Sequence, residues 1–356
     1  MSATPLISVI ITCYNNAAYI GAAIESVLAQ DYARKEIIVV DNGSSDGSLE
    51  IMRAFVPAIR LISHDVRGPG AARNRGMREA SGDFFALLDG DDVWLAGKLS
   101  AQVRALRQYP SARFCCTSFY RWFSGKDGDF ACTPPTPART VWPSYGDAYF
   151  GDVFPEVLRY THVWTSTVLL RRDLPAEVGH FDESLRLAQD LDYWCRIGSA
   201  NPVLFLARPT ALYRQAPSSS VRAFKDTCYA ARVLERWYEV AAERNPAEAV
   251  QGQRRIAAAW RRHGYKAIAA GVRASALASL REAQRRDELA LSDRLRLAMC
   301  RTPPSFAVLR ALEPNRGGGS RPGDAGWQAF VLFPKDEALF DARKQAPTER
   351  APSSAA

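Results

Sequence analysis

Residues 6–14 of the chain read LISVIITCY, a continuous apolar run rich in β-branched residues. A run of this kind indicates a strand that is buried on both faces of a parallel sheet. Apolar residues at helical spacing follow it, and a second such run, KEIIVVDNG, begins at residue 35. IRLISHD (59–65) and SGDFFALLDGDD (81–92) repeat the pattern, each with a helix-like segment after it. This alternation predicts an α/β fold with a Rossmann-like, mostly parallel sheet and helices on both faces.

Three parts of the chain differ in composition. Residues 1–222 contain the alternating pattern and are expected to form one α/β domain, with a long loop over residues 124–147. Residues 223–300 are dominated by Ala, Arg and Leu at helical spacing and predict a helical C-terminal region. Residues 301–356 contain GGG and Pro/Ser-rich stretches, which predict a linker and a mostly flexible tail.

The composition narrows the class of protein. The 356 residues are 47% hydrophobic and carry a net charge of +8, but no long Lys/Arg run points to a nucleic-acid partner. Basic helical faces that include Arg254, Arg255, Arg261 and Arg262 make an anionic membrane surface a candidate partner; a solvated face is the alternative. The seven cysteines form no C-x-x-C pair. No stretch approaches the roughly 20 apolar residues of a membrane span. We therefore expect a cytoplasmic location, including a peripheral one on the inner face of the membrane.

Polar residues follow three of the predicted strands, at positions 12–15, 41–47 and 89–92. Ligands of open α/β sheets bind at the carboxyl ends of the strands, so these residues are expected to share one site. The last group places Asp89, Asp91 and Asp92 within four residues. Such oxygen-rich clusters suit Mg²⁺ or Mn²⁺. The alternative is a turn in which an aspartate caps the next helix.

Residues 67–74 read RGPGAARN and precede a predicted helix. Glycines and basic side chains at a helix N-terminus favour an anionic ligand, although a plain strand-to-helix turn would have the same sequence. Arg73 occupies the position of the third glycine in G-x-G-x-x-G. A dinucleotide site of the Rossmann type is therefore not expected here.

Four stretches together resemble glycosyltransferase family 2, which has the GT-A fold. They are ISVIITCYNNAAYI (7–20), IIVVDNGSSDGS (37–48), the segment of residues 68–94 that contains ARN and LDGDD, and GHFDESLRLAQDLDYWCRI (179–197) followed by LYR (212–214). They occur in the family's order and cover most of residues 5–215. The resemblance implies a GT-A catalytic domain over residues 1–222. It also implies an inverting transferase that uses a nucleotide-diphospho-sugar.

The resemblance assigns roles position by position. Asp89 and Asp91 match the D-x-D motif, with Asp91 the expected direct metal ligand, and Asp190 matches the catalytic base. Residues that match the nucleotide-sugar site are Thr12, Tyr14, Asp41, Arg73, Asn74, Asp89 and Asp91. Asp190 also has an alternative interpretation as a helix cap.

A second set of residues carries weaker expectations. Trp164, Thr165 and Trp194 are candidates for acceptor binding, with buried core as the alternative for either tryptophan. Three positions depart from the family pattern: Asn42 and Gln189 replace common acids, and Ala216 replaces a common histidine. A histidine contact to metal or phosphate after LYR is therefore not expected.

The expected reaction is metal-assisted transfer of a hexosyl or related sugar from a donor such as a UDP-sugar to a hydroxyl group. The acceptor would be a glycan or a lipid-linked molecule, as in polysaccharide biosynthesis. In such a reaction a carboxylate accepts the proton of the acceptor hydroxyl, and a divalent cation stabilises the leaving diphosphate. Two other classes stay open: a nucleotidyltransferase, which would release pyrophosphate, and a catalytically inactive nucleotide-sugar-binding scaffold.

Overall fold

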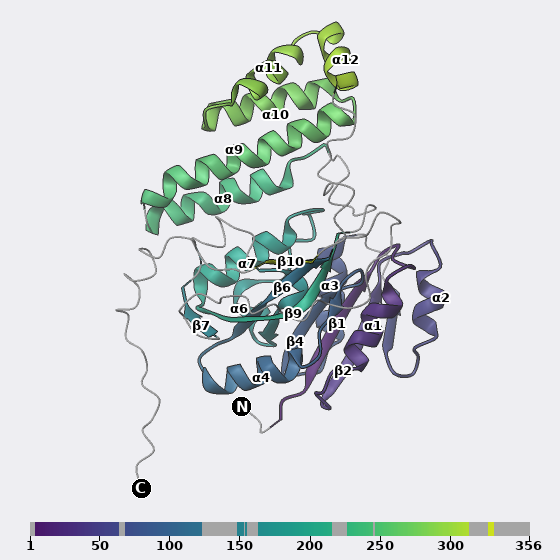
Figure 1. The fold of residues 1–356 in the computed structure, drawn as a ribbon. Coiled ribbons are helices and arrows are strands. Elements are labelled where there is room, and N and C mark those ends of the chain that lie inside the picture. Colours follow the sequence, from purple (N-terminus) through teal and green to yellow (C-terminus); the bar gives the residue numbers. More distant parts are fainter. Residues whose placement is uncertain are drawn as a thin grey trace.

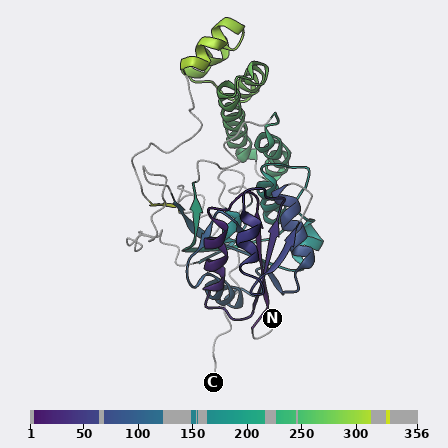
Figure 2. The same ribbon diagram turned by 90° about the vertical axis from the view of Figure 1, so that its right-hand side faces the viewer.

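The computed structural model describes a central sheet flanked by helices, with a stack of further helices at one end (Figure 1). Turned by 90°, the stack projects away from the sheet domain (Figure 2). The described residues are 4–63, 68–122, 148–152, 154, 163–215, 226–244, 246–312 and 327–330, without side-chain detail for 247–249 and 327–330. The loop expected over residues 124–147 lies outside them.

In the described part of the chain, ten strands form one sheet. The order along its main path is β3-β2-β1-β4-β8-β6-β9-β5, while β7 pairs with β9 and β10 with β6. The strands are β1 (Ile7–Cys13), β2 (Lys35–Asp41), β3 (Arg60–Ser63), β4 (Phe84–Asp89), β5 (Val93–Trp94), β6 (Phe114–Trp122), β7 (Ala148–Gly151), β8 (Leu169–Arg171), β9 (Val203–Arg214) and β10 (Trp327–Phe330). Strands β1 to β4 are parallel, and β6 is parallel to β9, whereas β5, β7, β8 and β10 pair antiparallel. The predicted fold class is confirmed.

Helices cover both faces of this sheet. They are α1 (Ile20–Leu28), α2 (Ser48–Arg53), α3 (Pro69–Glu79), α4 (Lys98–Gln108), α6 (Leu174–Val178) and α7 (Gln189–Ala200), with a 3-10 turn, η1 (Thr165–Thr167), before β8. Side chains alternate along β1, so Val9 and Ile11 pack with α1, α2 and α4, whereas Ile10 packs with α3, α6 and α7. Two hydrophobic cores therefore fix the helices that carry the site.

The described residues of the helical region form five helices. They are α8 (Tyr229–Arg244), α9 (Pro246–Ala269), α10 (Arg273–Arg286), α11 (Leu291–Met299) and α12 (Pro303–Leu312). Helix α8 joins the core that contains α7, while α9 to α12 enclose a smaller core around Ile268, Leu280 and Phe306. None of the described helices combines the length and the apolar character that a membrane crossing requires.

Some elements differ from the expectations. The segment interpreted as linker and tail also contains α12, whose Phe306 packs into the helical core, and β10, which pairs with β6. The helix-like segment after residues 81–92 begins only at Lys98, because Gly97 adopts a φ of 78° and Trp94 belongs to β5. Residues 165–167, directly before β8, form the turn η1.

Candidate active site

The carboxyl ends of three parallel strands meet at one edge of the sheet. Cys13 on β1 pairs with Asp41 on β2, and Thr12 pairs with Asp89 on β4. The N–H of Gly90 donates to the Thr12 carbonyl oxygen at 2.9 Å, and a Cβ at Gly90 would lie 2.8 Å from that same oxygen. The middle position of the D-x-D motif therefore requires glycine, because β4 ends in close contact with β1.

The segment after β2 folds back onto the segment after β1. Asp41 is buried, and its Oδ1 accepts a hydrogen bond from the Ser44 N–H at 3.2 Å. Ser44 Oγ in turn accepts one from the N–H of Asn15, which has a φ of 51°. These bonds join the ends of β1 and β2, where Asp41 pairs with Cys13, the neighbour of both Thr12 and Tyr14, and Tyr14 is 45% exposed to solvent.

Asp89, the last residue of β4, and Asp91, two residues later, differ in their partners. Asp89 is ion-paired, with its Oδ1 2.6 Å from Nη2 of Arg73 on α3. Arg73 is only 4% exposed, and its Nε and Nη1 have no hydrogen-bond partner in the part of the chain that the structure describes. Burial and the nearby Asp89 raise the pKa of Asp91 to about 6. No other described residue donates a hydrogen bond to the Asp91 carboxylate or pairs with it.

The third carboxylate, Asp92, is a structural residue. It is buried, and it accepts hydrogen bonds from Trp164 Nε1 (2.7 Å), Ser166 Oγ (2.6 Å) and the Arg214 N–H (3.0 Å). Burial and the neighbouring carboxylates hold its pKa well above the usual range. Asp92 therefore ties the end of β4 to η1 and β9, and it is not available as an open ligand.

Arg214, at the end of β9, was not assigned a role from the sequence. Its Nε donates to the Asp91 carbonyl oxygen at 2.8 Å, and its guanidinium lies over the rings of Tyr19 (4.6 Å) and Trp122 (4.0 Å). The signal was present in LYR, the last stretch of the resemblance. The structure thus places a second arginine, besides Arg73, beside the acidic segment.

Asp190 lies in the first turn of α7. Its Oδ1 accepts a hydrogen bond from the N–H of Leu191 at 2.8 Å, but the residue at the cap position is Ala188, with a φ of 61°. The interpretation of Asp190 as a cap is therefore wrong. Burial raises its pKa, Arg73 opposes that rise and Asp89 adds to it. A helix N-terminus favours the ionised form of a nearby carboxylate, but burial has the larger effect on Asp190.

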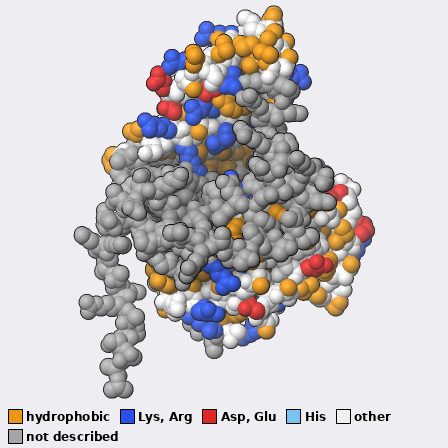
Figure 3. Space-filling model, viewed as in Figure 1, with side chains coloured by type: hydrophobic (Ala, Val, Ile, Leu, Met, Phe, Trp, Pro, Cys, Tyr) orange, Lys and Arg blue, Asp and Glu red, His pale blue; other side chains and the backbone are white. Residues whose placement is uncertain are grey.

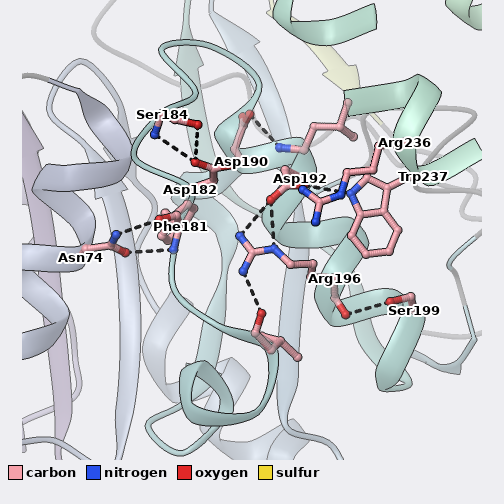
Figure 4. A network of polar contacts seen from close by, with 12 residues as sticks. Asn74, Phe181, Asp182, Ser184, Asp190, Asp192, Arg196, Ser199, Arg236 and Trp237 are labelled. Atoms are coloured by element: carbon pink, nitrogen blue, oxygen red, sulfur yellow. Dashed lines mark hydrogen bonds and ion pairs between the residues drawn. The ribbon is translucent and has the colours of Figure 1, made fainter. Parts of the chain in front are cut away.

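Two hydrogen bonds between the Asn74 side-chain amide and the Phe181 backbone, called the clasp below, join α3 to the loop before α7 (Figure 4). Asn74 Nδ2 donates to the Phe181 carbonyl oxygen (2.9 Å), and the Phe181 N–H donates back to Asn74 Oδ1 (3.0 Å). Asn74 Nδ2 also donates to Glu183 Oε1 at 2.8 Å. Asn74 is 1% exposed, so within the structure its amide serves this clasp.

The three candidates for acceptor binding differ in their surroundings. Trp164 stacks on Tyr213 with ring centroids 3.6 Å apart and is partly buried at the edge that carries Asp92. Thr165 is buried in η1. Trp194 is 2% exposed and packs against Phe114 in the core under α7, so the expectation that it lines an acceptor pocket is wrong.

The residues at this edge fit a divalent cation. Asp91 offers a carboxylate without another partner among the described residues, and its raised pKa means that a nearby cation would stabilise its ionised form. Asp89 is shared with Arg73. Within the described residues no group of three or more His, Cys, Asp or Glu side chains is arranged to enclose a metal. Asp91 and Asp89 could therefore supply part of an open coordination shell.

A mostly parallel sheet whose carboxyl edge carries a D-x-D pair, with a helix-borne carboxylate near them, defines a domain of the GT-A class. Residues 8–145 match the family model described as Glycosyl transferase family 2.

Relatives with curated names agree with this assignment. An uncharacterized glycosyltransferase, RP339, of Rickettsia prowazekii is 30% identical over 202 residues, which is 57% of this chain and 61% of that protein. The UDP-Glc:alpha-D-GlcNAc-diphosphoundecaprenol beta-1,3-glucosyltransferase WfgD of Escherichia coli is 40% identical over 100 residues, 28% of this chain and 40% of WfgD. The chain thus spans less than two thirds of the length of either relative.

Solved structures share the fold at low sequence identity. TarS 1–349 of S. aureus has a TM-score of 0.55 and is 18% identical, with 86% of this chain and 90% of that chain covered. Its complex with UDP-GlcNAc has a TM-score of 0.52, with the same identity and coverage. At this identity the similarity establishes the fold.

Proposed function

We propose that the protein is an inverting glycosyltransferase. It would move a sugar from a nucleotide-diphospho-sugar to a hydroxyl group of a glycan or lipid-linked acceptor, assisted by Mg²⁺ or Mn²⁺. The observation that carries this proposal is the position of Arg73. Its guanidinium pairs with Asp89 of the D-x-D motif, and it is close enough to Asp190 to oppose the rise in that residue's pKa. Arg73 therefore connects the proposed donor side to the proposed base.

In this mechanism Asp190 accepts the proton of the attacking hydroxyl. A carboxylate with a raised pKa is a stronger base, and general base catalysis is typically worth about 10²–10⁴-fold in rate. A single displacement with one base inverts the anomeric centre. Arg73 keeps enough positive charge near Asp190 for the carboxylate to ionise, and its buried position excludes water from that interaction.

On the donor side, Thr12, Tyr14 and Asp41 would bind the base and ribose, and Asn74 would support the pocket through the clasp. Asp91 would be the direct ligand of the cation, with Asp89 shared between the cation and Arg73. When bound, a divalent cation supplies Lewis-acid stabilisation of the leaving diphosphate. Trp164 would lie on the acceptor side, near Asp92, whereas the neighbouring Thr165 is buried in η1 and would act there only through Trp164.

The donor and acceptor classes are proposed by analogy with the matched proteins. The solved complex of TarS contains UDP-GlcNAc, and WfgD is named for a UDP-Glc donor and a diphosphoundecaprenol-linked acceptor. We propose a nucleotide-sugar donor such as a UDP-sugar and a role in polysaccharide biosynthesis. A lipid-linked acceptor would place the protein at the cytoplasmic face of a membrane.

A panel of nucleotide-sugars, screened for thermal stabilisation with Mn²⁺ present, tests this proposal. A ligand that binds only the native state at about 100 times its Kd stabilises it by about 2.7 kcal/mol, so the correct donor should raise the Tm by several degrees. Release of a nucleoside diphosphate with that donor would then identify a glycosyltransferase. Release of pyrophosphate from a nucleoside triphosphate would instead favour a nucleotidyltransferase. Binding without turnover across acceptor extracts would favour an inactive scaffold.

A further inference from the structure

The positive charge of the protein is concentrated in the helical region. Residues 226–312 contain 16 Lys and Arg against 9 Asp and Glu, so this region carries +7 of the chain's net +8. The sheet domain and the remaining segments are therefore nearly neutral in total. A charge that gathers on one part of a protein draws that part toward anionic surfaces.

Three arginines gather at one end of this region. Arg273, at the start of α10, donates from Nη1 to the carbonyl oxygens of Cys300 and Arg301, each at 3.2 Å. The Arg310 guanidinium lies against Gly271, in the turn between α9 and α10. Among the described residues, Arg273, Arg301 and Arg310 form no ion pair with an acid. Their charges are thus not neutralised within the described structure.

Exposed apolar side chains lie on the two helices beside these arginines. Leu291 (83% exposed) and Leu295 (62%) are one turn apart on α11, and Val308 (53%) and Leu312 (71%) are one turn apart on α12. They are four of the eight large hydrophobic residues that are exposed in the described part of the chain. Figure 3 shows hydrophobic side chains gathered at this tip of the molecule, with Lys and Arg around them. Clustered exposed apolar residues mark an interaction surface more often than single ones do.

We propose that the tip formed by α11, α12 and the turn between α9 and α10 docks on an anionic phospholipid surface. The docking surface consists of Leu291, Leu295, Val308, Leu312, Arg273, Arg301 and Arg310. The apolar side chains enter the boundary between headgroups and acyl chains, and the arginines contact lipid phosphates. Charge complementarity favours this partner over a second copy, because the same three unpaired arginines would face one another across a symmetric dimer.

This surface differs from the one that the sequence suggested. Of the four arginines on the basic faces of α9, Arg255 and Arg261 are partly buried, whereas Arg254 and Arg262 are exposed. The inference deepens the proposed function by naming the membrane surface on which a lipid-linked acceptor would be met. It does not depend on that function, because lipid binding can be measured without a donor or an acceptor.

Co-sedimentation of the full chain with vesicles tests the proposal. The wild type should bind vesicles of phosphatidylcholine with 30% phosphatidylglycerol at low salt and should bind pure phosphatidylcholine weakly. Each arginine near an anionic surface contributes about fivefold to partitioning. Arg301→Gln with Arg310→Gln should therefore reduce binding about 25-fold. Val308→Asp with Leu312→Asp should reduce it more than tenfold.

Matched variants separate this surface from general charge and hydrophobicity. Arg254→Gln with Arg281→Gln removes the same charge from exposed positions away from the tip, and Val250→Asp changes an apolar residue that is 62% exposed on α9. Both control variants should bind like the wild type. Equal loss in control and tip variants, or binding without dependence on phosphatidylglycerol, would overturn the proposal. Concentration-dependent self-association that the tip variants abolish, without vesicle binding, would identify a second copy as the partner and would also overturn it.

Donor binding distinguishes this result from a failure of the proposed function. The tip variants should keep the thermal stabilisation by nucleotide-sugar and Mn²⁺ that the wild type shows. If no nucleotide stabilises any variant, the vesicle result still stands and the proposed function fails by itself.

Discussion

Trp237 on α8 donates a hydrogen bond from its indole N–H to Asp192 Oδ1 at 3.0 Å, across the boundary between the helical region and the sheet domain. Asp192 is 1% exposed, and its other oxygen accepts from Nε of Arg196 at 2.9 Å (Figure 4). It lies two residues after Asp190, in the same first turn of α7. A hydrogen bond from α8, in the C-terminal region, therefore supports the first turn of α7.

Trp237→Phe should lower turnover while donor affinity stays unchanged. The variant leaves one acceptor site of a buried carboxylate unfilled, which costs about 1.5–3 kcal/mol of unfolding free energy and loosens the turn that carries Asp190. Trp260→Phe is the matched control, because its indole bonds to Glu235 within the helical region at 3.1 Å. Denaturant unfolding and steady-state kinetics would measure both effects. Equal kcat for the two variants would show that α8 does not position α7.

Asp190→Asn should retain donor and metal binding and lose about 10²–10⁴ in turnover, because the amide cannot accept the proton. The base must be ionised to act, so wild-type kcat should fall as the pH drops through the Asp190 pKa. Burial places that pKa above the usual value for aspartate. The pH profile of kcat should show this acid limb. A variant with wild-type turnover would assign the base to another group, and parallel loss of donor affinity would make Asp190 a donor-site residue.

Asp91→Asn should abolish metal-dependent activity and leave the fold intact, because among the described residues no other side chain depends on this carboxylate. Asp92→Asn is the contrasting variant. It weakens the bonds to Trp164 and Ser166 and should lower the Tm as well as the activity. Activity with Mn²⁺ titrated against chelator, together with thermal melts, separates the two. Full activity of Asp91→Asn in chelator would contradict the assigned role.

Lys98 should make the stability of the protein pH-dependent. It is fully buried, with Nζ donating to Gln102 Oε1 at 2.6 Å and lying 4.2 Å from the centroid of the Trp94 ring, and burial lowers its pKa to about 7. The unfolded chain therefore holds more protons than the native state between about pH 7 and pH 10.4. The unfolding free energy should rise with pH in this window, by at most about 1.4 kcal/mol per pH unit for one group.

Lys98→Met removes this proton, so the rise with pH should be smaller in the variant than in the wild type. Denaturant titrations of both proteins from pH 7 to pH 9.5 measure the unfolding free energy of each. The contributions of other titrating groups cancel in the difference between the two proteins. Parallel pH profiles would mean that Lys98 keeps its charge in the core.

The sequence predicted the elements whose signal is local. The apolar runs of β1, β2 and β4 are continuous, and the polar residues at their ends make Asp41, Asp89 and Asp91 candidates from the sequence alone. Strands β5 and β8 have two and three residues, too few for a periodic pattern, and their pairing depends on partners more than 50 residues away.

The site showed the same division. Motifs make Asp190 a candidate for the base, but they do not reveal that Asp92 is buried or that Arg214 lies over Tyr19 and Trp122. These contacts join side chains from distant segments, and each segment by itself reads as an ordinary strand end or loop. Trp194 shows the opposite case, in which an aromatic residue near a motif belongs to the core.

The clasp between Asn74 and Phe181 has a consequence for the synthesis of the chain. Its partners are 107 residues apart, so a ribosome has completed the segment that matches the family model, residues 8–145, well before Phe181 emerges. Until then the Asn74 amide lacks the Phe181 backbone groups with which it forms hydrogen bonds in the complete fold. In that fold Asn74 is buried, so water cannot replace these bonds there. A nascent chain that ends near residue 145 should therefore contain the D-x-D strand but remain open around α3. Protease resistance in this half of the protein should appear only after the loop before α7 has been made.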